Sequence, residues 1–160
     1  MKTTTICFLL KDDEILLAMK KRGFGVGKWN GVGGKVNEGE SVEDAAIREI
    51  KEEIGVAVDE SNLQNFGTLK FSFEDNHEWD NFCHIFLIRH WSGEPSESEE
   101  MRPKWFKANE LPFSEMWIDD PLWLPRVLAG EKIEAAFAFG EKGLKLNEAI
   151  FSSFEKGNIL

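Results

Sequence analysis

The sequence predicts one domain of mixed α and β structure, either an α+β domain or a mixed sheet between helices in an α/β/α sandwich. The chain has 160 residues, of which 42% are hydrophobic, and this is enough to build a core without disulfides or structural metals. Predicted strands and helices are mixed without the regular strand–helix–strand repeat of a parallel sheet. We therefore expect residues 1–160 to form a single domain.

Each strand is predicted from an apolar run bounded by turn residues. The first two runs flank Lys11, Asp12 and Asp13, whose polar side chains suit a hairpin turn. Phe71 and Phe73 are two residues apart, so they point to one face of a strand. The predicted strands are residues 3–10, 14–19, 66–73, 81–89, 101–107, 133–139 and 143–151, the last two as a hairpin. The predicted loops are the glycine-rich residues 20–31 and the acidic residues 93–100.

Two segments are predicted to be helices. The first covers residues 41–54, where Ser41 suits the N-cap and Gly55 is a natural stop. The second covers residues 119–129 and has Pro125 in or near its start.

Charge and hydropathy exclude several classes of function. The 29 acidic and 19 basic residues give a net charge of −10, whereas proteins that grip duplex DNA or RNA are usually basic. We therefore expect no nucleic acid polymer as a partner. No apolar run approaches 18 residues, which predicts no membrane-spanning helix and no membrane partner. The apolar residues 5–10 stop at Lys11 without a cleavage site, so they indicate a strand rather than a signal peptide.

The cysteine and aromatic residues add three expectations. Cys7 and Cys83 have neither metal-binding nor redox spacing, which predicts two buried reduced thiols and a cytoplasmic location. Tryptophan is costly to bury without a partner for its N–H group, so some of the six Trp side chains are expected to line a pocket. No apolar stripe is left over after the core is assigned, and we expect a monomer.

The segment from residue 38 to residue 60 holds nine acidic and two basic residues. On the predicted helix, one arc of about 100° is apolar and is expected to pack on the sheet. This arc consists of Ala46, Ile47, Ile50 and Ile54.

A second arc of this helix carries Glu49, Glu52 and Glu53, at positions i, i+3 and i+4. Such neighbours lie about 5–6 Å apart and repel each other. One interpretation is a solvated acidic helix. A cation site explains the cluster better, because carboxylate oxygens are the ligands that Mg²⁺ prefers.

The same segment contains the spacing G-x5-E-x7-R-E-U-x-E-E-x-G-U, and every fixed position matches between Gly34 and Val56. It resembles the Nudix box. The resemblance implies the Nudix fold, an α/β fold with a mixed sheet sandwiched between helices. It also implies cleavage of a nucleoside diphosphate linked to another group, with Mg²⁺ or Mn²⁺ as cofactor. In this family water attacks phosphorus without a covalent enzyme intermediate.

The resemblance also implies roles for individual residues. Arg48, Glu49, Glu52 and Glu53 form the catalytic set, and it stays open which glutamate is the general base. The implied metal ligands are Glu49, Glu52, Glu53, the carbonyl of Gly33 and Glu100. A solvated acidic loop is the alternative for Glu100.

Outside the box, residues 19–31, 100–106, 111–113 and 116–120 resemble the MutT-type hydrolases of oxidised purine nucleoside triphosphates. This resemblance implies that Asn30, Asp119 and Asp120 read the base and that Trp117 stacks on it. The remaining substrate-binding residues implied by the resemblance are Thr5, Lys20, Gly33 and Gly34, with Phe24, Phe71 and Phe73 as apolar walls.

The pair Asp119 and Asp120 has a second interpretation as a helix N-cap, because Pro121 suits the first helical position. The two roles are compatible if Asp120 caps while Asp119 reads the base. Two adjacent buried carboxyls cannot easily both ionise, so we hypothesise that one is protonated when base is bound. Val32 and Ile118 depart from the family pattern, and we expect them to reshape the pocket edge. The preference between oxidised guanine and oxidised adenine therefore stays open.

The expected activity is hydrolysis of oxidised purine nucleoside triphosphates to monophosphate and pyrophosphate, which sanitises the nucleotide pool. Two alternatives stay open. One is a Nudix hydrolase for another nucleotide, such as an undamaged or methylated purine triphosphate, ADP-ribose or a dinucleoside polyphosphate. The other is a non-catalytic module that binds nucleotides.

Overall fold

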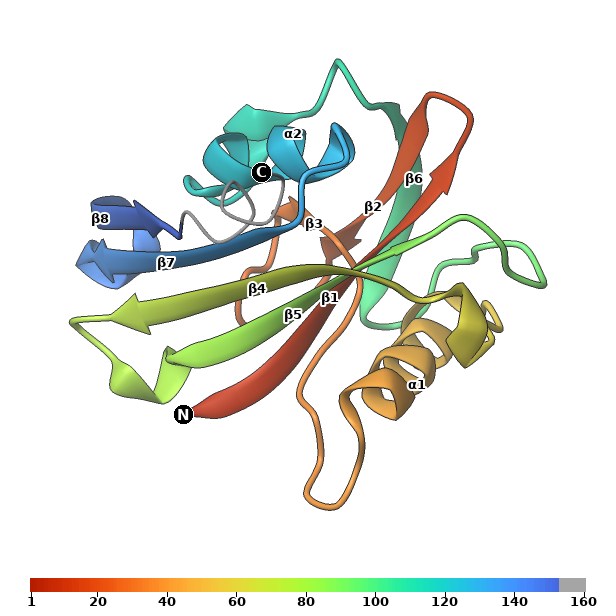
Figure 1. Cartoon of the computed structure of the whole chain (residues 1–160), viewed down its shortest axis with the longest axis horizontal. Coiled ribbons are helices and arrows are strands. Elements are labelled where there is room, and N and C mark those ends of the chain that lie inside the picture. The colour runs from red at the N-terminus through yellow and green to blue at the C-terminus, as the bar shows by residue number, and fades with distance from the viewer. Residues whose placement is uncertain (153–160) are drawn as a thin grey trace, which may run out of the picture.

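A mixed β-sheet with one α-helix on each face organises the protein (Figure 1). The computed structural model describes residues 1–152, so the predicted domain boundary at residue 160 lies outside the described part. The strands are β1 Lys2–Lys11, β2 Glu14–Lys20, β3 Trp29–Asn30, β4 Gln64–Phe73, β5 Asn81–Ile88, β6 Met101–Lys107, β7 Ile133–Gly140 and β8 Lys145–Phe151. The helices are α1 Val42–Ile54 and α2 Asp120–Leu128, and short 3-10 turns lie between some of these elements.

The strand order is β3-β2-β1-β5-β4-β7-β8, and β6 pairs with β2 outside this path. The pairs β1–β5 and β4–β7 are parallel, and the other pairs are antiparallel. This arrangement confirms the predicted α/β fold with a mixed sheet. Between its terminal lysines, β1 consists of apolar residues and threonines because both of its faces are covered. Phe8 lies in the core beneath α2, and Leu9 lies in the core beneath α1.

Helix α1 begins and ends as predicted. The Ser41 hydroxyl accepts a hydrogen bond of 3.0 Å from the Asp44 N–H group. Gly55 adopts a left-handed conformation with φ 74°, and its N–H group donates to the Lys51 carbonyl. The predicted apolar face was wrong in one position. Ala45 is buried and Ile47 is half-buried, because the helix lies with its alanine edge against the sheet.

Two further predictions were wrong in detail. Residues 20–31 were expected to be irregular, yet Trp29 and Asn30 pair with β2. Burial explains the difference, because the Trp29 ring packs 4.9 Å from the Phe106 ring. In α2, Pro125 lies inside the helix rather than near its start, and the first turn holds Pro121 instead. Pro121 lacks an N–H group that the first turn would leave unpaired in any case.

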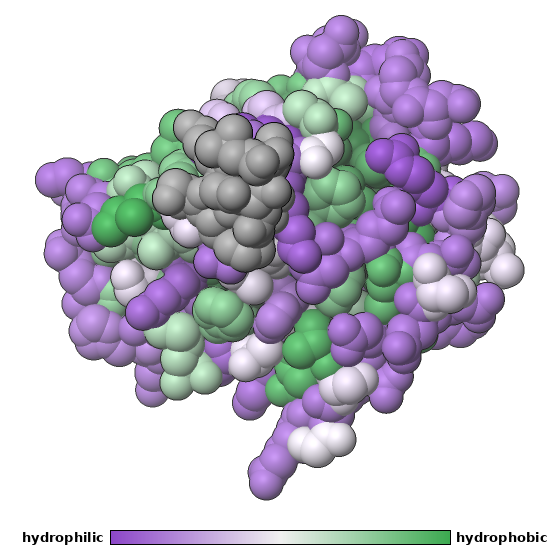
Figure 2. Space-filling model, in the orientation of Figure 1, coloured by the Kyte–Doolittle hydropathy of each residue, from purple (hydrophilic) through white to green (hydrophobic). Residues whose placement is uncertain are grey.

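Both cysteines are free and buried, which confirms the predicted reduced thiols. Cys7 faces the core beneath α1 and Cys83 faces the core beneath α2, so the sheet separates them. Within residues 1–152, no helix is long and apolar enough to cross a membrane. On the face shown in Figure 2, hydrophilic side chains cover most of the surface and the hydrophobic ones form separate small groups.

Candidate active site

A cavity of about 600 Å³ opens between the sheet, the start of α2 and the segment of residues 21–28. Its walls come from parts of the chain that are distant in sequence. Every residue that the sequence predicted to contact substrate lines this cavity. These residues are Thr5, Lys20, Phe24, Asn30, Gly33, Gly34, Phe71, Phe73, Trp117, Asp119 and Asp120. The fold therefore gathers the whole predicted set around one space.

Aromatic rings form the apolar side of the cavity. The Phe24 and Trp117 rings are stacked, with centroids 5.1 Å apart and planes 25° apart. Phe73 meets the edge of Trp117 at 6.4 Å. The Lys28 ammonium lies over the Trp117 ring, 5.4 Å from its centroid. A flat ligand that enters the cavity therefore meets an aromatic wall next to a cation.

Sequence reasoning missed two rings of this wall. Trp79 lies 4.5 Å from Phe24 and 5.5 Å from Phe73, and it comes from the short turn between β4 and β5. No sequence pattern marks that turn. Phe139 stacks on Phe73 at 4.8 Å. Phe139 and Phe137 are two residues apart on β7, so the sequence could have predicted that both rings point to the same face of the strand.

The polar end of the cavity holds two buried carboxyl groups. Asp119 and Asp120 are 2% and 3% exposed. The indole Nε1 of Trp123 donates a hydrogen bond of 2.8 Å to Asp119 Oδ2. Asp120 Oδ2 is buried without a hydrogen-bond partner among the residues described. A buried acceptor without a donor is costly, which suits a group that meets a ligand.

Burial raises the pKa of Asp119 to about 6, against the hydrogen bond from Trp123 that lowers it. Burial also raises the pKa of Asp120 well above its usual range, and the charge of Asp119 adds to this. The neutral form of one carboxyl is therefore favoured. The N-cap interpretation was wrong. Asp119 holds the cap position, but its carboxylate makes no capping hydrogen bond and accepts from Trp123 instead, and Asp120 is already the first residue of the helix.

Glycines allow the chain to pass closely between β1 and α1. At Gly33, φ is 154°, and an added Cβ would lie 2.1 Å from the Thr5 carbonyl oxygen. At Gly34, an added Cβ would lie 2.7 Å from the Glu49 carboxylate. The Gly33 N–H group donates to Glu53 Oε1 at 3.0 Å. These contacts join the cavity to the acidic face of α1.

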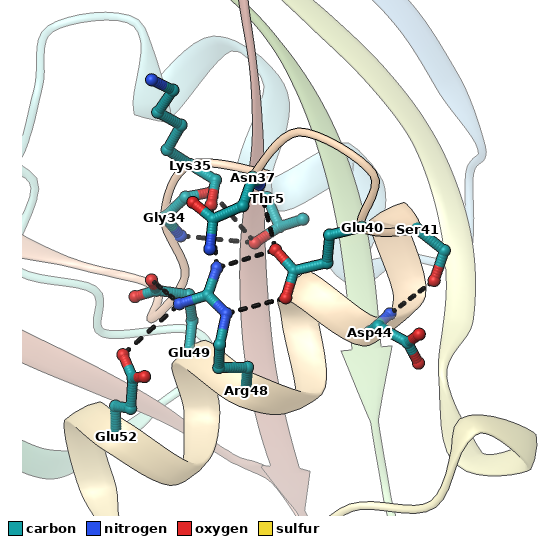
Figure 3. Close-up of polar contacts among 10 residues, drawn as sticks. All are labelled: Thr5, Gly34, Lys35, Asn37, Glu40, Ser41, Asp44, Arg48, Glu49 and Glu52. Atoms are coloured by element: carbon teal, nitrogen blue, oxygen red, sulfur yellow. Dashed lines mark hydrogen bonds and ion pairs between the residues drawn. The ribbon is translucent and has the colours of Figure 1, made fainter.

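Arg48 organises the carboxylates of α1 (Figure 3). Its guanidinium lies 2.7 Å from Glu49 Oε1 and 3.4 Å from Glu52 Oε2. It also holds both oxygens of Glu40, at 2.8 and 2.9 Å, and donates to the Lys35 carbonyl. The hydrogen bonds from Arg48 lower the pKa of Glu40 to about 2. Arg48 therefore positions carboxylates from two segments.

Burial raises the pKa of Glu53 to about 7, with a contribution from the charge of Glu49. Burial also raises the pKa of Glu49. Partly buried carboxylates crowded in this way favour a neutralising cation. Their hard oxygen donors are of the type that Mg²⁺ and Mn²⁺ bind, so the donor set fits such an ion.

The predicted metal ligands do not converge in the described structure. No three acidic, histidine or cysteine side chains within residues 1–152 are grouped as a ready metal site. Protein donors hold the carboxylates instead, and Glu100 pairs with Arg22 at 2.6 Å. A bound cation would therefore have to replace these hydrogen-bond donors at the carboxylate oxygens.

Residues that were singled out for other reasons lie elsewhere. Val32 is buried beneath α1 and Ile118 is exposed, and neither lines the cavity. The expectation that these two departures reshape the pocket edge was therefore wrong for the wall itself.

The NUDIX domain family matches residues 1–127 of this chain. The chain belongs to the Nudix family. Over 86% of both chains, this Nudix protein is 47% identical to the oxidized purine nucleoside triphosphate hydrolase of Danio rerio. It is 44% identical to the protein of the same name from Mus musculus, over 91% of this chain and 92% of the relative. The resemblance drawn from the box and from the flanking segments is confirmed.

Among solved structures, the Nudix chain is similar to a MutT protein from Bacillus halodurans. The TM-score is 0.82 at 24% identity, with 95% of this chain and 98% of that chain covered. This similarity confirms the α/β fold.

Proposed function

We propose that this Nudix protein hydrolyses oxidised purine nucleoside triphosphates to the monophosphate and pyrophosphate. One observation carries the proposal. The cavity that places Asn30 and the buried Asp119–Asp120 pair around Trp117 continues to the Gly33–Gly34 segment, which contacts the acidic face of α1. A base site and a phosphate site are thus joined in one space. The names of the zebrafish and mouse relatives support this substrate class.

At the base end, an amide and two carboxyls offer both donors and acceptors, as the edge of an oxidised purine requires. We propose that one of Asp119 and Asp120 is protonated when base is bound. The unpartnered Asp120 Oδ2 and the crowding of two buried carboxyls support this assignment. The pair then donates with one group and accepts with the other, so more than one oxidised purine fits. Trp117 supplies the stacking face.

At the phosphate end, Glu49, Glu52, Glu53 and Glu100, with the Gly33 carbonyl, would hold Mg²⁺ or Mn²⁺. When bound, the cation neutralises phosphate charge and activates water. Arg48 fixes Glu49 and Glu52 relative to Glu40. Lys20 and Thr5 lie on the cavity wall, which supports the proposal that they contact the substrate. Because Gly33 and Gly34 carry no Cβ atoms, this segment lies directly against β1 and the carboxylates of α1.

We further propose that the chain is a cytoplasmic monomer of one domain and that its activity keeps damaged nucleotides out of DNA. Two free buried thiols support a reducing compartment. The scattered hydrophobic groups in Figure 2 support a monomer.

A pyrophosphate-release panel with Mg²⁺ at subsaturating concentrations tests the proposal. The panel compares 8-oxo-dGTP, 2-hydroxy-dATP and O6-methyl-dGTP with the four undamaged dNTPs. We expect at least one oxidised purine to be turned over at least tenfold faster than its undamaged counterpart. Fast turnover of undamaged or methylated nucleotides alone would favour another Nudix substrate. No turnover of any member would contradict the proposal and leave two alternatives, a hydrolase of ADP-ribose or a dinucleoside polyphosphate and a non-catalytic nucleotide-binding module.

A further inference from the structure

The segment of residues 21–28, which forms one wall of the cavity, is tied to the turn before β6 by ion pairs. Lys21 Nζ lies 2.6 Å from Glu97 Oε2. Arg22 holds Glu100 Oε1 with two nitrogens, at 2.6 Å from Nη2 and 3.0 Å from Nε. The Lys21 N–H group also donates to the Glu100 carbonyl at 2.9 Å. The position of this wall therefore depends on the turn that carries Glu100.

Glu100 is also near α1, because the next residue in the chain, Met101, packs in the core beneath α1 with Ile50 and Ile54. Met101 is the register partner of Lys20 at the end of β2, and both of these residues line the cavity. The charge of Glu100 also contributes to raising the pKa of Glu53. The Glu100 carboxylate thus pairs with the loop of residues 21–28 and adds negative charge near Glu53 of the proposed metal site.

The donors that hold the four predicted carboxylate ligands are of two kinds. Arg48 and the Gly33 N–H group belong to the Nudix box or adjoin it, and they hold Glu49, Glu52 and Glu53. Arg22 lies outside the box, on the segment that carries Phe24. Its ion pair connects a proposed metal ligand to the segment that carries Phe24 of the cavity wall.

We propose that Arg22 competes with the divalent cation for Glu100, so that cation binding breaks one of the ion pairs that tie the segment of residues 21–28 to this turn. The inference rests on the proposed function, which supplies the cation. Arg22 is a positioning residue in this account, because it acts through Glu100. By linkage, whatever moves this segment also changes the affinity for the cation. The side chains of Arg22 and Glu100 are 61% and 45% exposed, so the competition is modest, roughly two- to fivefold in affinity.

Binding of Mn²⁺ without nucleotide tests this inference, with free Mn²⁺ counted by electron paramagnetic resonance. The full chain is compared with Arg22→Met and with Lys21→Met. Both variants lose one positive charge from the same exposed segment, so general electrostatics act equally on them. We expect Arg22→Met to bind Mn²⁺ roughly two- to fivefold more tightly than Lys21→Met does. Equal affinities in the two variants would overturn the inference.

The variant Glu100→Gln, combined with Arg22→Met, gives a double-mutant cycle for the ion pair. We expect it to weaken Mn²⁺ binding and to abolish the effect of Arg22→Met. An effect of Arg22→Met that persists in the Glu100→Gln background would show that Arg22 acts elsewhere, which overturns the inference. Wild-type protein that binds no Mn²⁺ would remove the metal site of the proposed function and, with it, the inference. Wild-type binding without any effect of Arg22→Met would remove the inference alone.

Discussion

Trp123 Nε1 donates a hydrogen bond of 2.8 Å to Asp119 Oδ2, so a fully buried residue of α2 fixes a carboxyl at the polar end of the cavity. The bond satisfies the hydrogen-bonding group of each partner. Without the bond, the indole N–H would be unpaired in the core, and the carboxylate would lose the donor that favours its charged form. The core and the base site are therefore coupled through one bond.

The variant Trp123→Phe removes this donor while it keeps an aromatic ring in the core. We expect the free energy of unfolding to fall by about 2–4 kcal/mol, because Asp119 Oδ2 is left buried and a small void forms. Urea denaturation measures the loss. Trp91→Phe is the matched control, because Trp91 stacks on Trp105 outside the cavity lining. An equal loss in the two variants would contradict the role of the bond.

The buried acid pair makes stability depend on pH. The folded protein holds a proton on Asp119 up to a pKa of about 6, whereas the unfolded chain releases it near 3.8. The contribution of Asp119 to stability therefore decreases as the pH rises from about 4 to about 7, because the folded state binds this proton more tightly than the unfolded chain does. We expect metal-free Asp120→Asn to be more stable than wild type at pH 7.5, with the gain shrinking toward pH 4. A gain that is constant across this range would contradict the assignment.

The variant Glu53→Gln separates catalysis from folding. Its amide oxygen still accepts from Gly33 N–H, and it removes a buried carboxyl whose pKa is raised to about 7. We expect kcat to fall by orders of magnitude, since a proposed metal ligand is lost. The metal-free free energy of unfolding at pH 8 should stay equal or rise. Glu38→Gln, an exposed change in the same box, should alter neither quantity.

Gly33→Ala tests the close passage of the chain beside β1. The added Cβ would lie 2.1 Å from the Thr5 carbonyl oxygen, so backbone has to shift. We expect a loss of about 3 kcal/mol or more in the free energy of unfolding. Gly39→Ala is the control, because its φ of +81° is also left-handed but open space surrounds it. That variant should lose about 1 kcal/mol, from the backbone conformation alone. Similar losses at the two positions would contradict the steric explanation.

Local sequence signals accounted for much of the fold. Ser41 and Gly55 define the ends of α1 because capping depends on a few neighbouring residues. The rotation of that helix was less predictable, since Ala45 and Ile47 lie on opposite edges of the apolar face and packing on the sheet decides which edge is covered. Trp29 was missed as a strand residue because its pairing depends on the distant Phe106. Tertiary packing decides such cases.

In the candidate site too, local patterns were predictable from the sequence, whereas contacts between distant segments were not. The spacing of the box indicated the acidic face of α1, because its residues are neighbours on one helix. Trp79 gave no signal, because its place against Phe24 requires two loops to meet. The ion pair of Arg22 with Glu100 was equally invisible, since 78 positions separate the two residues. Contacts between distant loops are set by the fold rather than by any local pattern.

The central claim is that the cavity around Trp117 selects an oxidised purine. The most direct test is the ratio of kcat/KM for 8-oxo-dGTP to kcat/KM for dGTP, measured for wild type and Asp119→Asn with Mg²⁺. We predict a ratio above about ten for wild type, which corresponds to about 1.4 kcal/mol in the transition state, and a changed ratio in the variant. A wild-type ratio near one, or an equal loss for both nucleotides in Asp119→Asn, would contradict it.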